Sequence, residues 1–140
     1  LGVELQALDD LFAKSDIVSL HAPALPETLR MVGAAQFAKL RDGALFINTA
    51  RAALVDEGAF LDALRQDRFA AAIDVFETEP LQGDSPFRSL PNVSLAPHSA
   101  GHTTDTYRRQ GAALVEEIER FFNGEKLRYE VTGSMLATMA

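Results

Sequence analysis

The stretch most informative about the fold is Ala44-Leu-Phe-Ile-Asn-Thr-Ala-Arg51. In it, an apolar run ends in polar residues whose side chains could take part in binding or catalysis. Three other short apolar runs end in the same way: 17–20 before His21, 71–73 before Asp74, and 93–96 before Pro97-His98. The four runs begin at residues 17, 44, 71 and 93, spacings of 27, 27 and 22 residues, which is about the size of a βαβ unit. We therefore expect four parallel strands, with the polar residues gathered at the edge where open α/β sheets bind ligands.

The segments between these runs carry helix signals. Asp56 is a good N-cap, and Val55 and Phe60 occupy the two positions of a hydrophobic staple, so a helix is expected from there to about residue 67. Apolar residues in 37–40 indicate a shorter helix that ends before residue 41. Helical spacing of apolar residues predicts a long helix over 104–122, which Asn123-Gly124 should end.

The strand runs and one loop show two further patterns. The runs at 17–20 and 44–48 are nearly continuous in apolar residues, which is typical of strands that are covered on both faces. The stretch 77–92 holds three prolines and a glycine, which together forbid a regular helix over most of it. A loop of this length inside a compact domain is usually functional.

Composition limits the class of protein. The chain has 140 residues, a formal net charge of -7 and no cysteine, and this length suits one domain. The acidic balance argues against nucleic acid as a partner, because phosphate binding needs basic groups. The lack of cysteine excludes a disulfide scaffold and fits the reducing cytoplasm, where we expect the protein. No apolar run approaches the roughly 18 residues of a membrane span, and residues 1–11 lack the features of a signal peptide. Because Leu1 is not an initiating methionine, we expect that the chain begins partway through a longer protein, or that it has been processed or expressed as a piece.

His98 is the best candidate for general acid and base chemistry. It follows a predicted strand, and the small residues after it would let a ligand approach the backbone. Imidazole can both donate and accept a proton near neutral pH, and a structural histidine at a strand end is the alternative. Glu79 can partner this histidine, because a carboxylate beside an imidazole stabilises the imidazolium form. Glu77 competes for that role.

Two more groups at the expected edge are chemically capable. Arg51 can grip a carboxylate with its guanidinium fork, although most lone arginines are simply solvated. Asp74 ends an apolar run, where a carboxylate is costly unless an amide-bearing ligand or a backbone N–H bonds to it. His21 and His102 are weaker candidates. The spacing of the three histidines matches no familiar zinc site, so no metal is expected.

Four motifs together resemble one known family. They are Ser15-Asp-Ile-Val-Ser-Leu-His-Ala-Pro23, Ile47-Asn-Thr-Ala-Arg-Ala-Ala-Leu-Val-Asp-Glu57, Asp74-Val-Phe-Glu-Thr-Glu-Pro80 and Pro97-His-Ser-Ala-Gly101. In this order and at these spacings they resemble the D-isomer-specific 2-hydroxyacid dehydrogenases, over about residues 5–122. Each motif alone is weak evidence, but four in register are strong evidence.

The resemblance implies an oxidoreductase that transfers a hydride between NAD(P)H and a small 2-keto or D-2-hydroxy acid. Arg51 would bind the substrate carboxylate and carbonyl, His98 would donate the proton, and Glu79 would keep His98 protonated. Asp74 would accept hydrogen bonds from the nicotinamide carboxamide. The residues implied to line the cofactor groove are His21, Ala22, Pro23, Thr28, Thr49, Ala50, Arg51, Asp74, His98, Ala100 and Gly101.

The resemblance also implies how much of the family's fold the chain holds. It predicts part of an α/β, doubly wound, Rossmann-like parallel sheet with flanking helices. No G-x-G-x-x-G motif occurs, so the first βαβ unit with its glycine-rich loop is expected to be missing. Residues 1–122 would form the second half of a nucleotide-binding domain, and 123–140 a return segment towards an absent substrate domain. We expect the isolated 140-residue chain not to be a competent dehydrogenase.

Several choices stay open at this level. The cofactor is expected to be NAD, but NADP remains possible because the ribose-binding segment is missing. Ala52 stands where the family usually has glycine, and His102 stands where a small residue is usual. The substrate could be glyoxylate, hydroxypyruvate, 3-phosphoglycerate or a bulkier keto acid. An unpaired sheet edge favours a homodimer. A corepressor-like module that senses the dinucleotide without turnover, and a structural domain without a ligand, are the alternatives.

Overall fold

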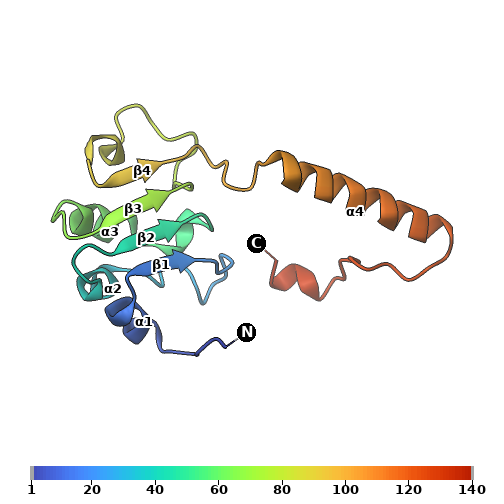
Figure 1. Cartoon of the computed structure of the whole chain (residues 1–140), viewed down its shortest axis with the longest axis horizontal. Helices are drawn as coiled ribbons and strands as arrows, with labels where there is room; N and C mark the ends of the chain where they lie inside the picture. Colours follow the sequence, from blue (N-terminus) through green and yellow to red (C-terminus); the bar gives the residue numbers. More distant parts are fainter. Residues whose placement is uncertain (1, 140) are drawn as a thin grey trace. The chain divides into compact units, whose positions relative to one another are not determined.

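The computed structural model describes residues 2–139, and the chain divides into two compact units, Leu1–His98 and Ser99–Ala140. Figure 1 labels the main elements. The first unit holds α1 (Leu8–Lys14), β1 (Ile17–Leu20), α2 (Ala34–Lys39), β2 (Leu45–Asn48), the 3₁₀ turn η1 (Ala52–Leu54), α3 (Glu57–Leu64), β3 (Ala70–Ile73), η2 (Pro86–Ser89) and β4 (Val93–Leu95). The second unit holds α4 (Thr104–Phe122) and η3 (Met135–Ala137).

The four predicted strands are confirmed, and they form one parallel sheet in the order β1-β2-β3-β4. The last pairs in register join Leu20 to Asn48, Asn48 to Ile73, and Ile73 to Leu95. These four residues form one row, so the residues that follow them begin at a common edge of the sheet. The polar residues that follow the four apolar runs in the sequence therefore start from neighbouring strand ends, as expected.

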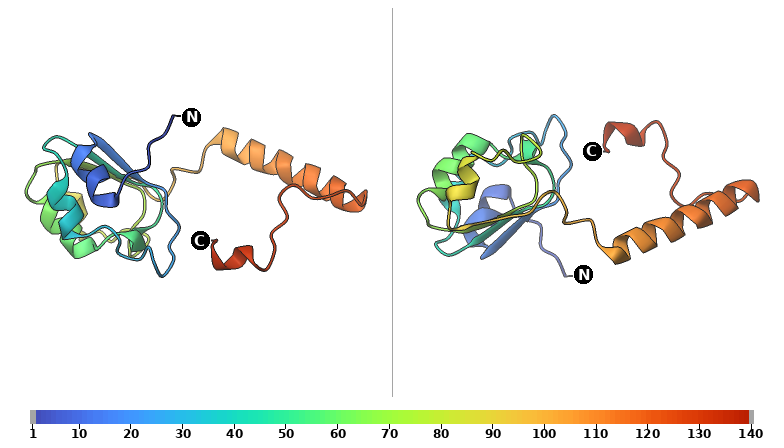
Figure 2. Two further views of the ribbon diagram at one scale, coloured as in Figure 1. Left: turned by 90° about the horizontal axis from the view of Figure 1, so that it is seen from below. Right: turned by 90° about the horizontal axis from the view of Figure 1, so that it is seen from above.

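An aromatic group on β2 joins three helices to the sheet. Phe46 is fully buried, and its ring lies 6.1 Å from Phe12 of α1, 5.3 Å from Phe37 of α2 and 5.2 Å from Phe60 of α3, measured between ring centroids. We call these four residues the Phe46 cluster. Because all three helices contact the same side chain, they cover the same face of the sheet, as Figure 2 shows.

The expectation that the strands are covered on both faces is wrong. Burial alternates along β1, where Ile17 is 62% exposed and its neighbour Val18 is 2% exposed. The cause is the strand order. Right-handed crossovers between strands that advance in one direction place every connection on the same face of the sheet. In this unit the opposite face is therefore left without helices.

The helix signals in the first unit are largely confirmed. The Asp56 carboxylate accepts a hydrogen bond from the N–H of Ala59 and caps α3, which ends at Leu64 rather than near residue 67. Val55 and Phe60 are both buried in the core, as the staple predicts. The shorter helix, α2, ends at Lys39, before residue 41 as expected.

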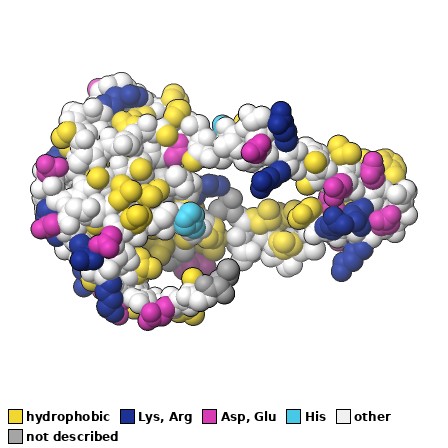
Figure 3. Space-filling model, viewed as in Figure 1, with side chains coloured by type: hydrophobic (Ala, Val, Ile, Leu, Met, Phe, Trp, Pro, Cys, Tyr) yellow, Lys and Arg dark blue, Asp and Glu magenta, His cyan; other side chains and the backbone are white. Residues whose placement is uncertain are grey.

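The second unit is built on α4, whose bounds match the predicted helix. The Thr103 hydroxyl accepts from the N–H of Thr106 at its start, and Gly124 adopts a positive φ of 67° just beyond its end. No residue of α4 is buried, and apolar and charged side chains lie side by side on its surface in Figure 3. Between residues 2 and 139, no helix combines the length and the apolar character needed to cross a membrane.

The one-sided core predicts unequal effects for two residues on neighbouring strands. Phe46→Ala should lower the free energy of unfolding of the chain by about 3–5 kcal/mol, because it empties the centre of the Phe46 cluster. Ile17→Ala, on the exposed face, should change it by less than about 0.5 kcal/mol. Urea denaturation measures both values. Equal losses in the two variants would contradict a core on one face.

Candidate active site

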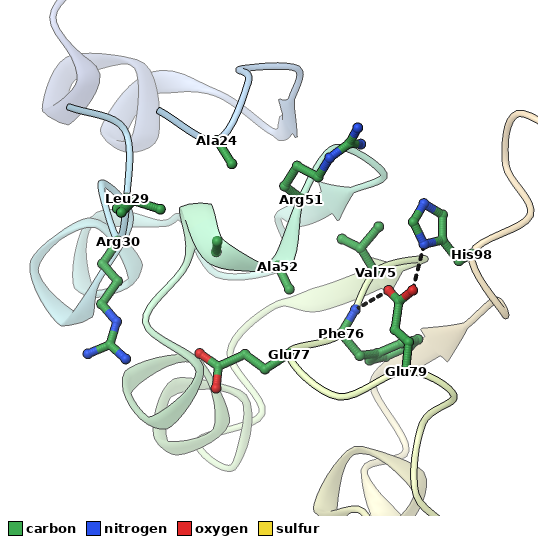
Figure 4. Close-up of a pocket in the computed structure, with 11 residues that line it drawn as sticks. Ala24, Leu29, Arg30, Arg51, Ala52, Val75, Phe76, Glu77, Glu79 and His98 are labelled. Atoms are coloured by element: carbon green, nitrogen blue, oxygen red, sulfur yellow. Dashed lines mark hydrogen bonds and ion pairs between the residues drawn. The ribbon is translucent and has the colours of Figure 1, made fainter. Parts of the chain in front are cut away.

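His98 and Glu79 form a direct pair. The Nδ1 atom of His98 lies 2.7 Å from Oε2 of Glu79, and the other carboxylate oxygen accepts a hydrogen bond of 3.0 Å from the N–H of Phe76. The two side chains are 49% and 37% exposed, so both remain within reach of a ligand. In Figure 4 the Glu79 carboxylate lies between the Phe76 backbone and the imidazole ring.

Of the two glutamates that the sequence offers as partner of His98, the structure pairs the imidazole with Glu79 and not with Glu77. The hydrogen bond from His98, and then the one from the Phe76 N–H, hold the pKa of Glu79 below its ordinary value of 4.5, so it is a carboxylate at neutral pH. Glu77 instead points away from the imidazole in Figure 4. Burial, and then the charge of Glu77, raise the pKa of Glu57 at the start of α3. Glu79 is therefore the carboxylate that places a negative charge beside the His98 imidazole.

The loop after β3 brings Glu79 to this position. Val75 and Phe76 are buried directly after the strand, which fixes the backbone three residues before Glu79. Further along, the Arg88 guanidinium donates to the carbonyls of Leu81 and Gln82 and closes the loop on itself. The predicted functional loop thus has an ordered frame with the carboxylate near its start.

His98 itself has an unusual backbone. Its φ is +54°, in the left-handed region that side chains rarely adopt. Histidine is among the residues that tolerate this region best, and such positions cluster at functional sites. The local geometry therefore supports a functional rather than a purely structural histidine.

Arg51 lies on the turn that follows β2. Its backbone is extended, with φ −148° and ψ 141°, and its Nη1 donates a 2.7 Å hydrogen bond to the carbonyl of Ala50. Arg51, Glu79 and His98 all line one cavity of about 640 Å³. Its other lining residues are Ala24, Leu29, Arg30, Ala52, Ala53, Val75, Phe76 and Glu77. A cation, an anion and an imidazole around one small-molecule cavity can bind a carboxylate and move a proton.

A second cavity of about 330 Å³ shares Phe76, Glu79 and His98 with the first. The remaining walls come mainly from Pro80, Leu81, Leu95 and Pro97. The His98–Glu79 pair therefore borders two hollows of this unit.

Several residues expected in the cofactor groove have local roles in the structure. Asp74 is 3% exposed at the end of β3, and its N–H donates to the carbonyl of Asn48 at 3.0 Å. The Thr28 hydroxyl donates to the carbonyl of Pro23 and accepts from the N–H of Leu25, which closes that loop. The imidazole Nε2 of His21 lies 2.9 Å from Oγ of Ser19.

The structure does not bring all the expected residues into the larger cavity. Ala100 and Gly101 belong to the second unit. Those of the first unit that do not line the cavity are His21, Ala22, Pro23, Thr28, Thr49, Ala50 and Asp74. Within residues 2–139, no three histidine, aspartate or glutamate side chains are grouped so that they could hold a metal ion.

Sequence reasoning missed two partners of the predicted residues. Asn48 is 2% exposed, and its side chain bonds to the N–H of Ala50 and to the carbonyl of Arg51. The signal was present, because a polar residue inside an apolar run needs a hydrogen-bond partner. The Phe76 N–H that holds Glu79 has no signal in the sequence, since every residue but proline has such a group.

The lowered pKa of Glu79 predicts a loss of stability in acid. A depressed pKa adds stability above the unfolded value of about 4.5, and this contribution is lost as the pH falls through the lower, folded value. Glu79→Gln should therefore flatten the fall of Tm between about pH 5 and pH 3. Glu27→Gln, an exposed loop glutamate, is the control. If the Tm of Glu79→Gln falls as steeply over this pH range as that of the parent, the result would contradict the pairing of Glu79 with His98.

Comparison with known proteins gives a consistent family. Residues 1–100 match the family described as D-isomer specific 2-hydroxyacid dehydrogenase, NAD binding domain. A glyoxylate reductase from Aeropyrum pernix is 40% identical over 126 residues, 89% of this chain and 38% of that protein. A D-3-phosphoglycerate dehydrogenase from Archaeoglobus fulgidus is 37% identical over 132 residues, 94% of this chain and 25% of that protein.

A solved structure agrees in fold. The D-lactate dehydrogenase from Lactobacillus jensenii, determined with NAD+, superposes with a TM-score of 0.81 at 29% identity, over 91% of this chain and 42% of that chain. The chain spans less than half the length of each of these three proteins. The likeness to the Lactobacillus jensenii structure covers the Rossmann-like parallel sheet described above. The chain thus belongs to the D-isomer specific 2-hydroxyacid dehydrogenase family, whose NAD binding domain it matches over residues 1–100.

Proposed function

We propose that the protein containing this chain is an NAD(H)-dependent oxidoreductase that interconverts a small 2-keto acid and a D-2-hydroxy acid. The observation that carries the proposal is the His98–Glu79 pair, 2.7 Å apart, on the same cavity as Arg51 in a member of this family. A domain that only binds a dinucleotide has no need of a paired acid and base beside an arginine.

The proton step follows from which imidazole nitrogen is engaged. Nδ1 of His98 faces Glu79, so Nε2 is the atom that donates a proton to the substrate carbonyl oxygen. The negative Glu79 carboxylate stabilises the imidazolium form that carries this proton. Arg51 binds the substrate carboxylate through its guanidinium fork and stabilises the oxygen as it gains charge.

The residues present fit a nicotinamide dinucleotide. Small and apolar side chains (Ala52, Ala53 and Val75) line the cavity beside Arg51, and such a wall suits the flat face of a nicotinamide ring. Asp74 lies buried at the end of the adjacent strand and would accept from the carboxamide. The segments 21–23 and 49–50, with Thr28, Ala100 and Gly101, would hold the rest. When bound, NADH supplies the hydride, and NADPH remains an open choice.

The proposal extends to organisation and partners. Residues 1–122 would be the second half of the nucleotide-binding domain, and 123–140 would lead back to a substrate domain. The substrate would be a small 2-keto or 2-hydroxy acid, and a second copy of the protein is the expected partner. The names of three relatives support this substrate class. They are a glyoxylate reductase, a D-3-phosphoglycerate dehydrogenase and a D-lactate dehydrogenase.

Loss of the proton donor should abolish turnover without loss of cofactor binding. His98→Asn removes the imidazole and keeps a residue that tolerates the positive φ. We expect kcat for NADH oxidation with a panel of 2-keto acids to fall by about 10²–10⁴-fold. NADH fluorescence titration should give an unchanged Kd.

Two outcomes of this experiment would point elsewhere. If the parent protein binds NADH tightly and turns over no acid in the panel, the sensing module without turnover becomes the better reading. If His98→Asn keeps full activity, another group donates the proton.

Arg51 should act more strongly on the acid than on the cofactor, although it also borders the cofactor groove. Arg51→Lys keeps the positive charge and loses the bidentate fork, so the KM of the keto acid should rise roughly 10- to 100-fold, in line with the loss of hydrogen bonds to a charged group. The KM of NADH should change by a much smaller factor. Arg65→Lys, at an exposed pair with Asp62 on α3, should change neither value. A rise in the KM of NADH alone would contradict the assignment.

A further inference from the structure

Asn48 is one of two buried polar or charged residues found in the described part of the chain, and the other is Asp74. It ends β2 at 2% exposure, three residues before Arg51. A buried amide of this kind is costly unless both its groups are bonded. Its partners therefore show what the residue does.

Both ends of the Asn48 amide bond to the turn that carries Arg51. Nδ2 donates to the carbonyl of Arg51 at 3.0 Å, and Oδ1 accepts from the N–H of Ala50 at 3.1 Å. The carbonyl of Arg51 also accepts a longer bond, 3.4 Å, from the N–H of Leu54. One side chain thus spans the turn from the end of β2 to the backbone of the arginine.

The Asn48 backbone bonds instead to the residue that follows the neighbouring strand, β3. Its carbonyl accepts from the N–H of Asp74 at 3.0 Å, and this bond does not involve the side chain. A substitution at Asn48 therefore removes the bonds to the Arg51 turn and leaves the bond to Asp74 in place.

We propose that Asn48 is a positioning residue that sets the place of the Arg51 guanidinium for the substrate carboxylate. This inference rests on the proposed function, in which Arg51 binds the acid. Without the Asn48 amide, the Ala50 N–H and the Arg51 carbonyl lose a partner, and the turn can rotate. A displacement of about 1 Å at a binding group costs roughly 100-fold in rate. The effect is larger on the keto acid than on NADH, because Arg51 binds the acid directly while residues 49–50 share the cofactor with several other segments.

Asn92 provides a matched control for stability. Its Nδ2 donates to the carbonyls of Leu64 and Phe69, at 3.0 and 2.9 Å, directly before β4 begins. It is thus an asparagine that also ties backbone groups together, at the opposite ends of the strands. Asn92→Ala should lower Tm and leave the KM of the keto acid unchanged.

The experiment uses the full protein that contains this chain, with steady-state kinetics on its best 2-keto acid, NADH titration and Tm for each variant. Asn48→Ala should lower kcat/KM for the acid roughly 10- to 100-fold, mainly through KM, and should change the Kd of NADH by a clearly smaller factor. Asn48→Asp keeps the size and the acceptor for the Ala50 N–H but turns the donor to the Arg51 carbonyl into an oxygen, so it should raise the KM of the acid as well. In an Arg51→Ala background, Asn48→Ala should add no further rise in KM, because the two residues act as one unit.

Three results would overturn the inference. The first is an unchanged KM in both Asn48 variants of an active protein. The second is full additivity with Arg51→Ala. The third is a joint loss of folded protein and NADH binding in both variants at constant KM, which would assign Asn48 to stability, as for Asn92. A parent protein that binds NADH and reduces no acid would instead defeat the proposed function.

Discussion

Contact between Phe46 and the aromatic rings of three helices fixes everything else in the first unit. Because α1, α2 and α3 meet on this one side chain, they all pack against the same face of the sheet, over β2. The strand ends then form a level row from Leu20 to Leu95. Polar residues beyond that row start from fixed points, which is what a site made from separate loops needs.

Beyond the row, each functional side chain is held by a short local contact. Asn48 holds the turn of Arg51, the Phe76 N–H holds Glu79, and Glu79 holds the ring of His98. Every holder lies within four residues of its own strand end or belongs to the site itself. The scaffold supplies the coarse placement, and these hydrogen bonds supply the orientation that catalysis would require.

The sequence predicts the fold well where local pattern and global order agree. The spacing of the apolar runs gives the four strands, and the long helix is predicted to its ends. Four-residue strands, however, are too short to reveal whether one face or two are covered, so Ile17 and Val18 look alike in sequence and differ fully in burial. The residues alone predict the partner of His98 only as Glu79 with Glu77 in competition, because the loop has no periodicity, and the family resemblance narrows the choice to Glu79. Asn48 shows in sequence as a polar residue in an apolar run, but its partners depend on the turn geometry.

The loop between β3 and β4 has two parts, a base that carries Glu79 and an exposed tip. Glu79 is fixed through Phe76 and His98, and Arg88 closes the loop base through the carbonyls of Leu81 and Gln82. Residues 83–84, which follow the bonded Gln82, are exposed, and exposed loop tips accept changes in length at little thermodynamic expense. The protein should therefore accept a reporter group or an added peptide at this tip without displacing Glu79 or His98, which makes the tip a practical place for labelling.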